Sequence, residues 1–280
     1  MKHPNLQQSS SSPEVVLIHG MWSTPETLIE LKTQFEHCGY QVYSPRLPFH
    51  FSKAELSDKA KQNALAQASI NDYVESLLSF INTLDAPPIL VGHSMGGLLA
   101  QLVAARTAVN KMVLISSASP AGINSWSWSV IRTFGHNLFK FPLYKKTTHL
   151  LLKNVKYGIA NTQTAQVQHD ILRKATFESG RASMEIGMWF LFPRPPTRVN
   201  AKDIHCPILL VCGAQDRITP VSVQRKIAKK YSTQCAAKDS SQEAENVTLK
   251  VIDEACHWTI GGSHLPAVSN HIFRWLEKIQ

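Results

Sequence analysis

The chain has 280 residues, of which 44% are hydrophobic and 18% charged, values typical of globular proteins and far from those of disordered chains. Basic residues exceed acidic ones by 9, and residues 121–200, with 11 basic and 3 acidic side chains, hold 8 of this excess. No apolar run approaches the roughly 18 residues that a membrane-spanning helix needs, so we expect no transmembrane segment.

The N-terminal segment and the cysteines indicate the compartment. Residues 1–14 form a polar tail that lacks the apolar stretch of a secretory signal. The cysteine count is odd and shows no paired metal-site spacing such as CxxC. Both features favour a reducing, cytoplasmic setting, and no metal is expected. The five cysteines are Cys38, Cys206, Cys212, Cys235 and Cys256.

Residues 14–119 alternate between short apolar runs and helix-like segments. Thr24-Pro25-Glu26 offers an N-cap, a proline at the first helical position and an early acid, and Ser69-Ile-Asn-Asp72 has capping-box spacing. The predicted elements in chain order are a strand at 14–18, a helix at 25–37, a strand at 41–43, a helix at 70–84, a strand at 88–91, a helix at 95–107 and a strand at 111–116.

The alternation stops at residues 120–203, where helix-like patches are rich in Trp, Phe and Lys, and then resumes. Strands are predicted at 207–212 and 247–253, and helices at 220–231 and 263–279. Fully apolar strands that alternate with helices predict a mostly parallel sheet covered on both faces, an α/β fold. We expect a core made of residues 15–119 and 204–280, with residues 120–203 as an inserted helical cap.

A possible nucleophile lies in Gly92-His93-Ser94-Met95-Gly96-Gly97, where a predicted strand meets a predicted helix. A serine at such a corner has strained backbone geometry and presents its hydroxyl above the sheet. Its neighbours two residues away must lack bulk for the turn to close, which explains Gly92 and Gly96. The GxSxG pattern alone is weak evidence, and the strand and helix around it provide the confirming context.

A serine hydroxyl needs a base, and the base needs an orienting group. His257 and Asp216 both fall just past the carboxyl ends of predicted strands, which share one crevice with Ser94 in an open parallel sheet. The chain order Ser, Asp, His fits this arrangement and differs from that of chymotrypsin-like and subtilisin-like proteases. Backbone N–H groups of Met95 and Met21 are the expected oxyanion donors.

Together these residues resemble the α/β-hydrolase family, from about Val15 to Trp275. The resemblance implies a serine esterase, lipase or lysophospholipase with Ser94 as nucleophile, His257 as base and Asp216 as acid. Too few residues precede the first strand for the family's opening antiparallel hairpin, so about six strands are expected. The stretches that carry the resemblance are Val16-Leu-Ile-His-Gly-Met-Trp22, Pro88 to Gln101, Val211-Cys-Gly-Ala-Gln-Asp-Arg-Ile-Thr-Pro220 and Cys256-His-Trp258, with Phe177-Glu-Ser-Gly-Arg-Ala182 similar to a cap segment.

Each site residue also has a structural interpretation. Ser94 could be a turn residue, His257 a surface histidine and Asp216 a cap of the helix near Pro220. The rival acids Asp253 and Glu254 lie on the segment that leads to His257 itself. His19 is expected to be a hydrogen-bonded residue around the site, and so is His93. The candidate substrate-pocket residues are Trp22, His93, Trp189 and Trp258.

The basic segment 121–200 is either a solvated face or a surface that attracts anions. Its aromatic residues interleave with Arg132, Lys140, Lys145 and Lys146, a combination that suits an amphiphilic or anionic substrate or peripheral contact with a membrane. No nucleic-acid partner is expected, because no binding motif is present.

The sequence leaves three kinds of function open. The first is hydrolysis of carboxylic esters or thioesters of a small-molecule substrate through an acyl-enzyme on Ser94. The second is acyl transfer or perhydrolysis by the same triad, and the third is a binding protein of this fold without catalysis. No dinucleotide fingerprint occurs, so no cofactor is expected. Ser94 disfavours dehalogenases and epoxide hydrolases, which use an aspartate nucleophile.

Overall fold

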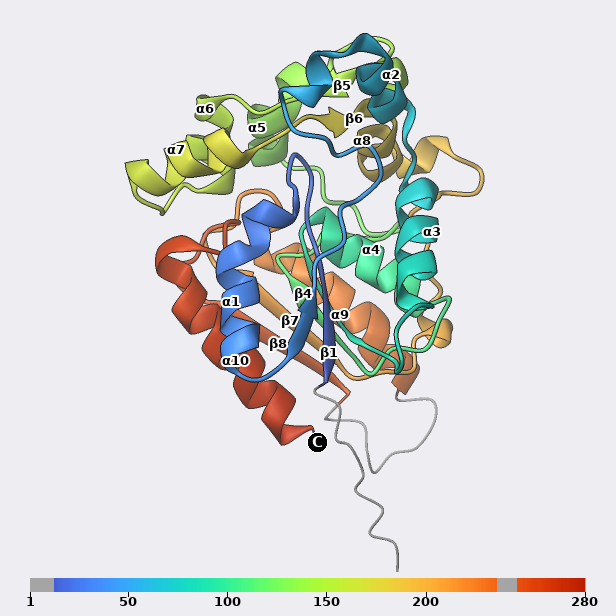
Figure 1. The fold of residues 1–280 in the computed structure, drawn as a ribbon, viewed down its shortest axis with the longest axis vertical. Helices are drawn as coiled ribbons and strands as arrows, with labels where there is room; N and C mark the ends of the chain where they lie inside the picture. The colour runs from blue at the N-terminus through green and yellow to red at the C-terminus, as the bar shows by residue number, and fades with distance from the viewer. Residues whose placement is uncertain (1–12, 236–245, 280) are drawn as a thin grey trace, which may run out of the picture.

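The computed structural model describes residues 13–235 and 246–279, with nothing stated for the side chains of 233–235, so residues 1–12 of the predicted tail lie outside the described part. Its main feature is a six-stranded sheet in the order β2-β1-β3-β4-β7-β8, in which every neighbouring pair is parallel (Figure 1). The parallel α/β prediction is confirmed. The strands are β1 (Glu14–Ile18), β2 (Gln41–Tyr43), β3 (Ile89–His93), β4 (Lys111–Ile115), β7 (Ile208–Gly213) and β8 (Val247–Ile252).

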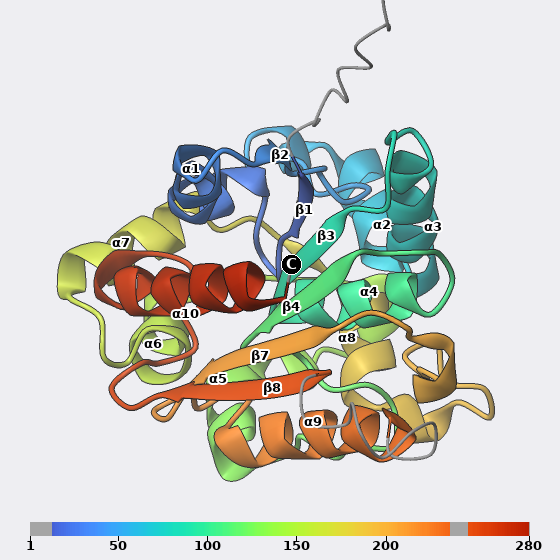
Figure 2. The ribbon, with the colours of Figure 1, turned by 90° about the horizontal axis from the view of Figure 1, so that it is seen from below.

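Side chains of the strands alternate between two helical layers, because successive residues of a strand point to opposite faces. Val15 and Leu17 of β1 pack in the core on the side of α1 and α10, whereas Val16 and Ile18 pack on the side of α3, α4 and α9. Figure 2 shows these two helical layers on opposite faces of the sheet. The helices are α1 (Ile29–His37), α3 (Ile70–Ile81), α4 (Met95–Ala104), α9 (Val221–Cys235) and α10 (Leu265–Lys278).

The structure confirms one of the predicted helix starts and differs from the other. Ser69 and Asp72 form the expected capping box at the start of α3. Thr24 makes no side-chain cap, and the segment after it begins with the 3₁₀ turn η1 (Pro25–Leu28) before α1. A proline at the first position suits either kind of turn, so the sequence could not separate them. A 3₁₀ turn η7 (Gly262–His264) likewise precedes α10.

A further layer lies beyond the carboxyl ends of the strands (Figure 1). Most of it comes from the segment between β4 and β7, and we call it the upper layer. The connection from β2 to α3 also contributes, because α2 packs against α8 and β6. The predicted core, residues 15–119 and 204–280, includes this connection. The elements of the upper layer are η2 (Glu55–Ser57), α2 (Lys59–Gln67), α5 (Trp128–Leu138), η3 (Leu143–Lys145), β5 (Thr147–Thr148), α6 (Leu152–Asn154), η4 (Val155–Ile159), α7 (Ala165–Lys174), β6 (Glu178–Ser179), α8 (Gly180–Gly187) and η5 (Trp189–Leu191). The segment then returns to the core through η6 (Ala201–Asp203).

A buried polar cluster ties the upper layer to the rest of the molecule. Glu178 of β6 pairs with His50, with 2.9 Å between Oε2 and Nε2, and both side chains are fully buried. The hydroxyl of Tyr73 on α3 donates to Glu178 Oε1 over 2.9 Å. The ring of His50 in turn lies 5.0 Å from that of His19, which follows β1. The cluster therefore joins β6, α3 and the loop after β1.

Candidate active site

Ser94 lies at the corner between β3 and α4 and is the strained residue that the sequence predicts. Its φ of 55° and ψ of −119° lie outside the regions that L-residues usually adopt. A Cβ on Gly92 would lie 2.2 Å from the carbonyl oxygen of Gly96, and one on Gly96 would lie 2.0 Å from that of Ile18. Only glycine fits at either position, and the tight corner leaves the Ser94 hydroxyl above the sheet.

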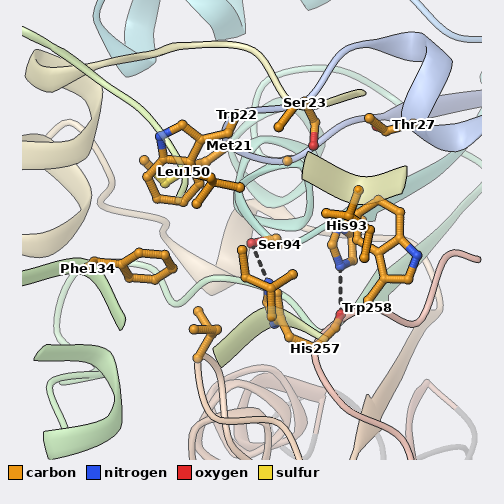
Figure 3. A pocket seen from close by; sticks show the side chains of 15 residues that line it. Met21, Trp22, Ser23, Thr27, His93, Ser94, Phe134, Leu150, His257 and Trp258 are labelled. Atoms are coloured by element: carbon orange, nitrogen blue, oxygen red, sulfur yellow. Dashed lines mark hydrogen bonds between the residues drawn. The ribbon is translucent and has the colours of Figure 1, made fainter. Parts of the chain in front are cut away.

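The three predicted triad residues come together from three loops at one end of the sheet. Ser94 Oγ lies 3.0 Å from Nε2 of His257, and Nδ1 of His257 lies 2.9 Å from Oδ2 of Asp216. Figure 3 shows the contact between Ser94 and His257. Asp253, the rival acid, has an exposed side chain in the turn after β8. The geometry therefore brings Asp216, rather than Asp253, to the imidazole.

The carboxylate of Asp216 is fully engaged by donors. Its Oδ1 accepts the backbone N–H groups of Ile218 and Thr219, each over 2.8 Å, and Oδ2 accepts the Thr219 hydroxyl over 2.9 Å. Burial alone raises the pKa of this carboxyl, but the His257 partner and the N–H donors outweigh burial, so the pKa of Asp216 is lowered. The acid is therefore ionised at neutral pH.

Thr219 is a residue that the sequence analysis did not single out. Besides Asp216, its hydroxyl lies within 2.9 Å of the carbonyl oxygen of Ser116 and 3.3 Å from His257 Nδ1. The signal was present as Asp216-Arg-Ile-Thr219, the spacing at which an aspartate accepts the N–H group three residues on. Both N–H donors precede α9, which begins at Val221, so the carboxylate of Asp216 binds its own turn and does not cap that helix.

His93 supports the site from behind. Its Nε2–H donates to the carbonyl oxygen of His257 over 3.0 Å, and the two rings lie 5.0 Å apart. Burial lowers the pKa of His93 to about 3, with a further contribution from the neighbouring His257. His93 is therefore neutral at physiological pH and fixes the backbone that carries His257.

The expected oxyanion donors lie on either side of Ser94 in the fold. Met95 is the first residue of α4, where N–H groups have no acceptor within the helix. The other donor, Met21, follows Gly20, whose carbonyl accepts the Nδ1–H of His19 over 3.0 Å. In a planar trans peptide unit the C=O and N–H bonds point in opposite directions, so the hydrogen bond to the Gly20 carbonyl also fixes where the Met21 N–H points. Burial lowers the pKa of His19 well below its usual value, which keeps the ring neutral.

Two cavities meet at Ser94. The smaller, of about 530 Å³ including space open to solvent, is lined among others by His93, Leu150, Ile171, His257 and Trp258, and we call it the histidine-side cavity. The larger, of about 790 Å³ on the same basis, is lined among others by Met95, Trp126, Val130, Leu138 and Ile186, and we call it the α5–α8 cavity. Five residues line both cavities: Met21, Trp22, Ser94, Phe134 and Ile218.

The structure places three of the four candidate pocket residues at these cavities. Trp22 lines both, and His93 and Trp258 line the histidine-side cavity. Trp189 lines neither, because it lies on η5, where its ring contacts Phe190. Phe134 and Ile218 line both cavities and were not among the candidates. The part of the chain that the structure describes contains no cluster of three or more potential metal ligands and no helix long and apolar enough to cross a bilayer.

Comparisons with known proteins place the chain among proteins of this fold. Three solved structures with a similar fold are a methylesterase from Arabidopsis (15% identity, 95% of this chain and 99% of that chain, TM-score 0.66), a monoacylglycerol lipase from Paleococcus ferrophilus (19%, 96% and 97%, 0.65) and a pyrethroid hydrolase from Sphingobium faniae (14%, 95% and 98%, 0.65). The comparison with curated proteins found no match. The model of the alpha/beta hydrolase family matches residues 15–273, and the chain therefore belongs to this family.

Proposed function

We propose that the protein hydrolyses carboxylic esters of small molecules through an acyl-enzyme on Ser94. The observation that carries this proposal is the unbroken chain of contacts from Ser94 Oγ through His257 to Asp216, at 3.0 and 2.9 Å. A nucleophile, a base and an orienting acid at these distances make up the arrangement that activates a serine hydroxyl. The likeness to esterases and lipases of the same fold agrees with it.

The geometry supports two half-reactions. His257 Nε2 takes the proton of Ser94 as Oγ attacks the ester carbonyl carbon, and the N–H groups of Met21 and Met95 stabilise the resulting oxyanion. The intermediate collapses when the C–O bond to the alcohol breaks and the proton passes from His257 to the departing oxygen. Water then repeats the sequence on the acyl-enzyme, which releases the carboxylic acid and restores Ser94. Asp216 stabilises the imidazolium in both halves.

In this proposal, the upper layer is a cap that shapes the substrate site and contacts a membrane surface. Phe139 and Phe141 are 82% and 92% exposed, and Tyr144, Lys145 and Lys146 are exposed next to them, so we call residues 139–146 the aromatic–basic loop. Among the residues that the structure describes, no lysine or arginine lines either cavity, so we place the effect of the positive charge on the outer surface.

Four unpaired cysteines among the described residues support the expected reducing, cytoplasmic setting.

Labelling with a fluorophosphonate tests the nucleophile. The wild-type protein should be labelled and should release p-nitrophenol from p-nitrophenyl esters, whereas Ser94→Ala should lose both while circular dichroism shows an intact fold. Losing Ser94 or His257 should each lower kcat by several orders of magnitude, and the double variant should lose little more, because the residues act as a unit. Labelling that persists in Ser94→Ala would refute the proposal.

A further inference from the structure

The two cavities at Ser94 differ in their relation to the base. His257 lines the histidine-side cavity and is not among the residues that line the α5–α8 cavity. Figure 3 shows the residues that line the histidine-side cavity, with His257 below Ser94 and Trp258 to the right of Ser94. One part of an ester bound at Ser94 can therefore lie in the cavity beside the imidazole of His257, and the other part in the cavity that the imidazole does not line.

The reaction assigns these cavities to the two halves of an ester. In the tetrahedral intermediate, the central carbon carries Ser94 Oγ, the oxyanion, the alcohol oxygen and the acyl chain. His257 Nε2 must reach the alcohol oxygen to deliver its proton as the C–O bond breaks. We infer that the alcohol lies in the histidine-side cavity and the acyl chain in the α5–α8 cavity. This assignment rests on the proposed ester hydrolysis at Ser94.

Trp22 and Phe134 line both cavities, and contacts with the upper layer hold Trp22 in place. The indole of Trp22 donates through Nε1 to Thr148 Oγ1 over 3.0 Å, and its ring lies 4.9 Å from that of Phe134. The backbone of Trp22 is also bonded to the upper layer, because its carbonyl oxygen accepts the N–H of Thr176 over 2.8 Å. Two side-chain contacts and a backbone bond hold Trp22 in place, so the lining that the two cavities share keeps a fixed shape beside Ser94.

The α5–α8 cavity suits an uncharged acyl chain. Several of its polar side chains already donate to the protein: Ser183 to the carbonyl oxygen of Ser179 over 2.6 Å, Asn137 to that of His149 over 2.8 Å and Trp126 to that of Gly187 over 2.6 Å. Much of the remaining lining is aliphatic or aromatic. The substrate class is therefore a neutral ester of an aliphatic carboxylic acid, whose chain is the larger half of the molecule.

A pair of isomeric esters tests the assignment. Ethyl octanoate and octyl acetate have the same atoms and the same length, but the long chain lies on the acyl side of one and on the alcohol side of the other. The quantity measured is the ratio of kcat/KM for ethyl octanoate to that for octyl acetate, by acid release. The wild-type ratio should exceed one, because the larger cavity takes the octanoyl chain.

Two matched substitutions should move this ratio in opposite directions. Val130 and Leu150 are partly buried aliphatic residues that line only the α5–α8 cavity and only the histidine-side cavity, respectively. Val130→Trp should lower the ratio and Leu150→Trp should raise it, each by roughly tenfold, the effect of about one blocked methylene or more. Leu191→Trp, at an exposed position that lines neither cavity, should leave the ratio unchanged.

A second pair protects the test from misfolding. Gly187 lines only the α5–α8 cavity, and a Cβ there would have its nearest neighbour, Trp126 Cζ2, at 4.0 Å, while Ala175 lines only the histidine-side cavity. Gly187→Leu and Ala175→Leu should reproduce the two opposite shifts. If each ratio moved in the direction reverse to the one expected, or if both variants of a pair shifted it equally while still reacting with fluorophosphonate, the assignment of the cavities would be wrong. The proposed esterase activity would stand. A wild-type protein that cleaves neither ester and is not labelled would overturn both.

Discussion

At the scale of single residues, the carboxylate of Asp216 is bonded both to its own turn and to His257. Two backbone N–H groups hold one of its oxygens, and His257 and the Thr219 hydroxyl approach the other. The same donors lower the pKa of Asp216 and keep its orientation fixed. The charge of this side chain, more than its shape, should therefore matter to catalysis.

Replacing Asp216 by asparagine tests that expectation. Asp216→Asn keeps the shape but removes the charge that selects the imidazole tautomer and stabilises the imidazolium, so kcat should fall by roughly 10²–10⁴-fold. The measurement is p-nitrophenyl ester turnover at saturation, with Asp253→Asn as the matched control at an exposed acid. Near-wild-type activity in Asp216→Asn, together with a loss in Asp253→Asn, would show that the acid is assigned wrongly.

Site residues that directly follow strands could be predicted from the sequence, whereas residues that contact them from other loops could not. Ser94, Asp216 and His257 could be placed because strand ends meet at one edge of a parallel sheet. Thr219 and the two cavity residues Phe134 and Ile218 were missed. Their positions depend on how loops and the upper layer pack, and neither spacing nor composition encodes that packing.

At the scale of secondary-structure elements, the cluster around Glu178 holds β6 against α3 and the loop after β1. Glu178 and His50 are both fully buried, and the Tyr73 hydroxyl and the Ser179 N–H also donate to the carboxylate. Burying polar groups is costly unless they are hydrogen-bonded. The stability of the upper layer should therefore depend on this pairing.

Glu178→Gln should destabilise the protein strongly. The substitution keeps the size of the side chain but replaces the carboxylate that His50, Tyr73 and Ser179 contact by an amide, and leaving a buried polar group unsatisfied costs about 1–3 kcal/mol. Urea unfolding measures the loss. Glu75→Gln breaks the exposed pair with Arg106 and should cost less than about 1 kcal/mol. Equal, small effects in both variants would mean that the buried pair contributes little.

The central strands of the core were predictable because their apolar runs are almost fully buried between two helical layers, which leaves a clear signal in the sequence. Boundaries shifted by only a few residues, as at α4, which ends at Ala104 where the sequence suggested about 107. The upper layer was predictable only as an insertion. Several of its elements are two to five residues long and are held by tertiary bonds such as that of Glu178.

At the scale of the whole molecule, the positive charge and the exposed aromatic rings coincide in the aromatic–basic loop. Lys145 lies over the ring of Tyr144, 5.7 Å from its centroid. Lys140 is different, because its ammonium donates to the carbonyl oxygen of Thr147 over 3.1 Å and contributes to the fold of the loop. A test of surface charge should therefore change Lys145 and Lys146 and leave Lys140 intact.

We expect the protein to bind vesicles that contain anionic phospholipids more tightly than neutral ones. Each basic residue near such a surface contributes about 1 kcal/mol, so the double variant Lys145→Gln, Lys146→Gln should bind roughly 30-fold more weakly. Binding should also weaken with salt. Phe139→Ser with Phe141→Ser should weaken binding to both vesicle types. Cosedimentation measures all three, and unchanged binding in both double variants would show that the loop is a solvated surface.

The hydrogen bonds of Trp22 limit how freely this scaffold can be rebuilt. The three triad residues belong to loops of the sheet, so exchanging the whole segment between β4 and β7 for a foreign one would leave them in place. Trp22, however, directly follows Met21, the proposed oxyanion donor, and its hydrogen-bond partners Thr148 and Thr176 belong to that segment. We expect a chimera that lacks an acceptor for the indole and a donor for the carbonyl to keep Ser94 but to lose the fixed position of the Met21 N–H. A replacement segment must therefore supply both hydrogen-bond partners of Trp22, in addition to joining the ends of β4 and β7.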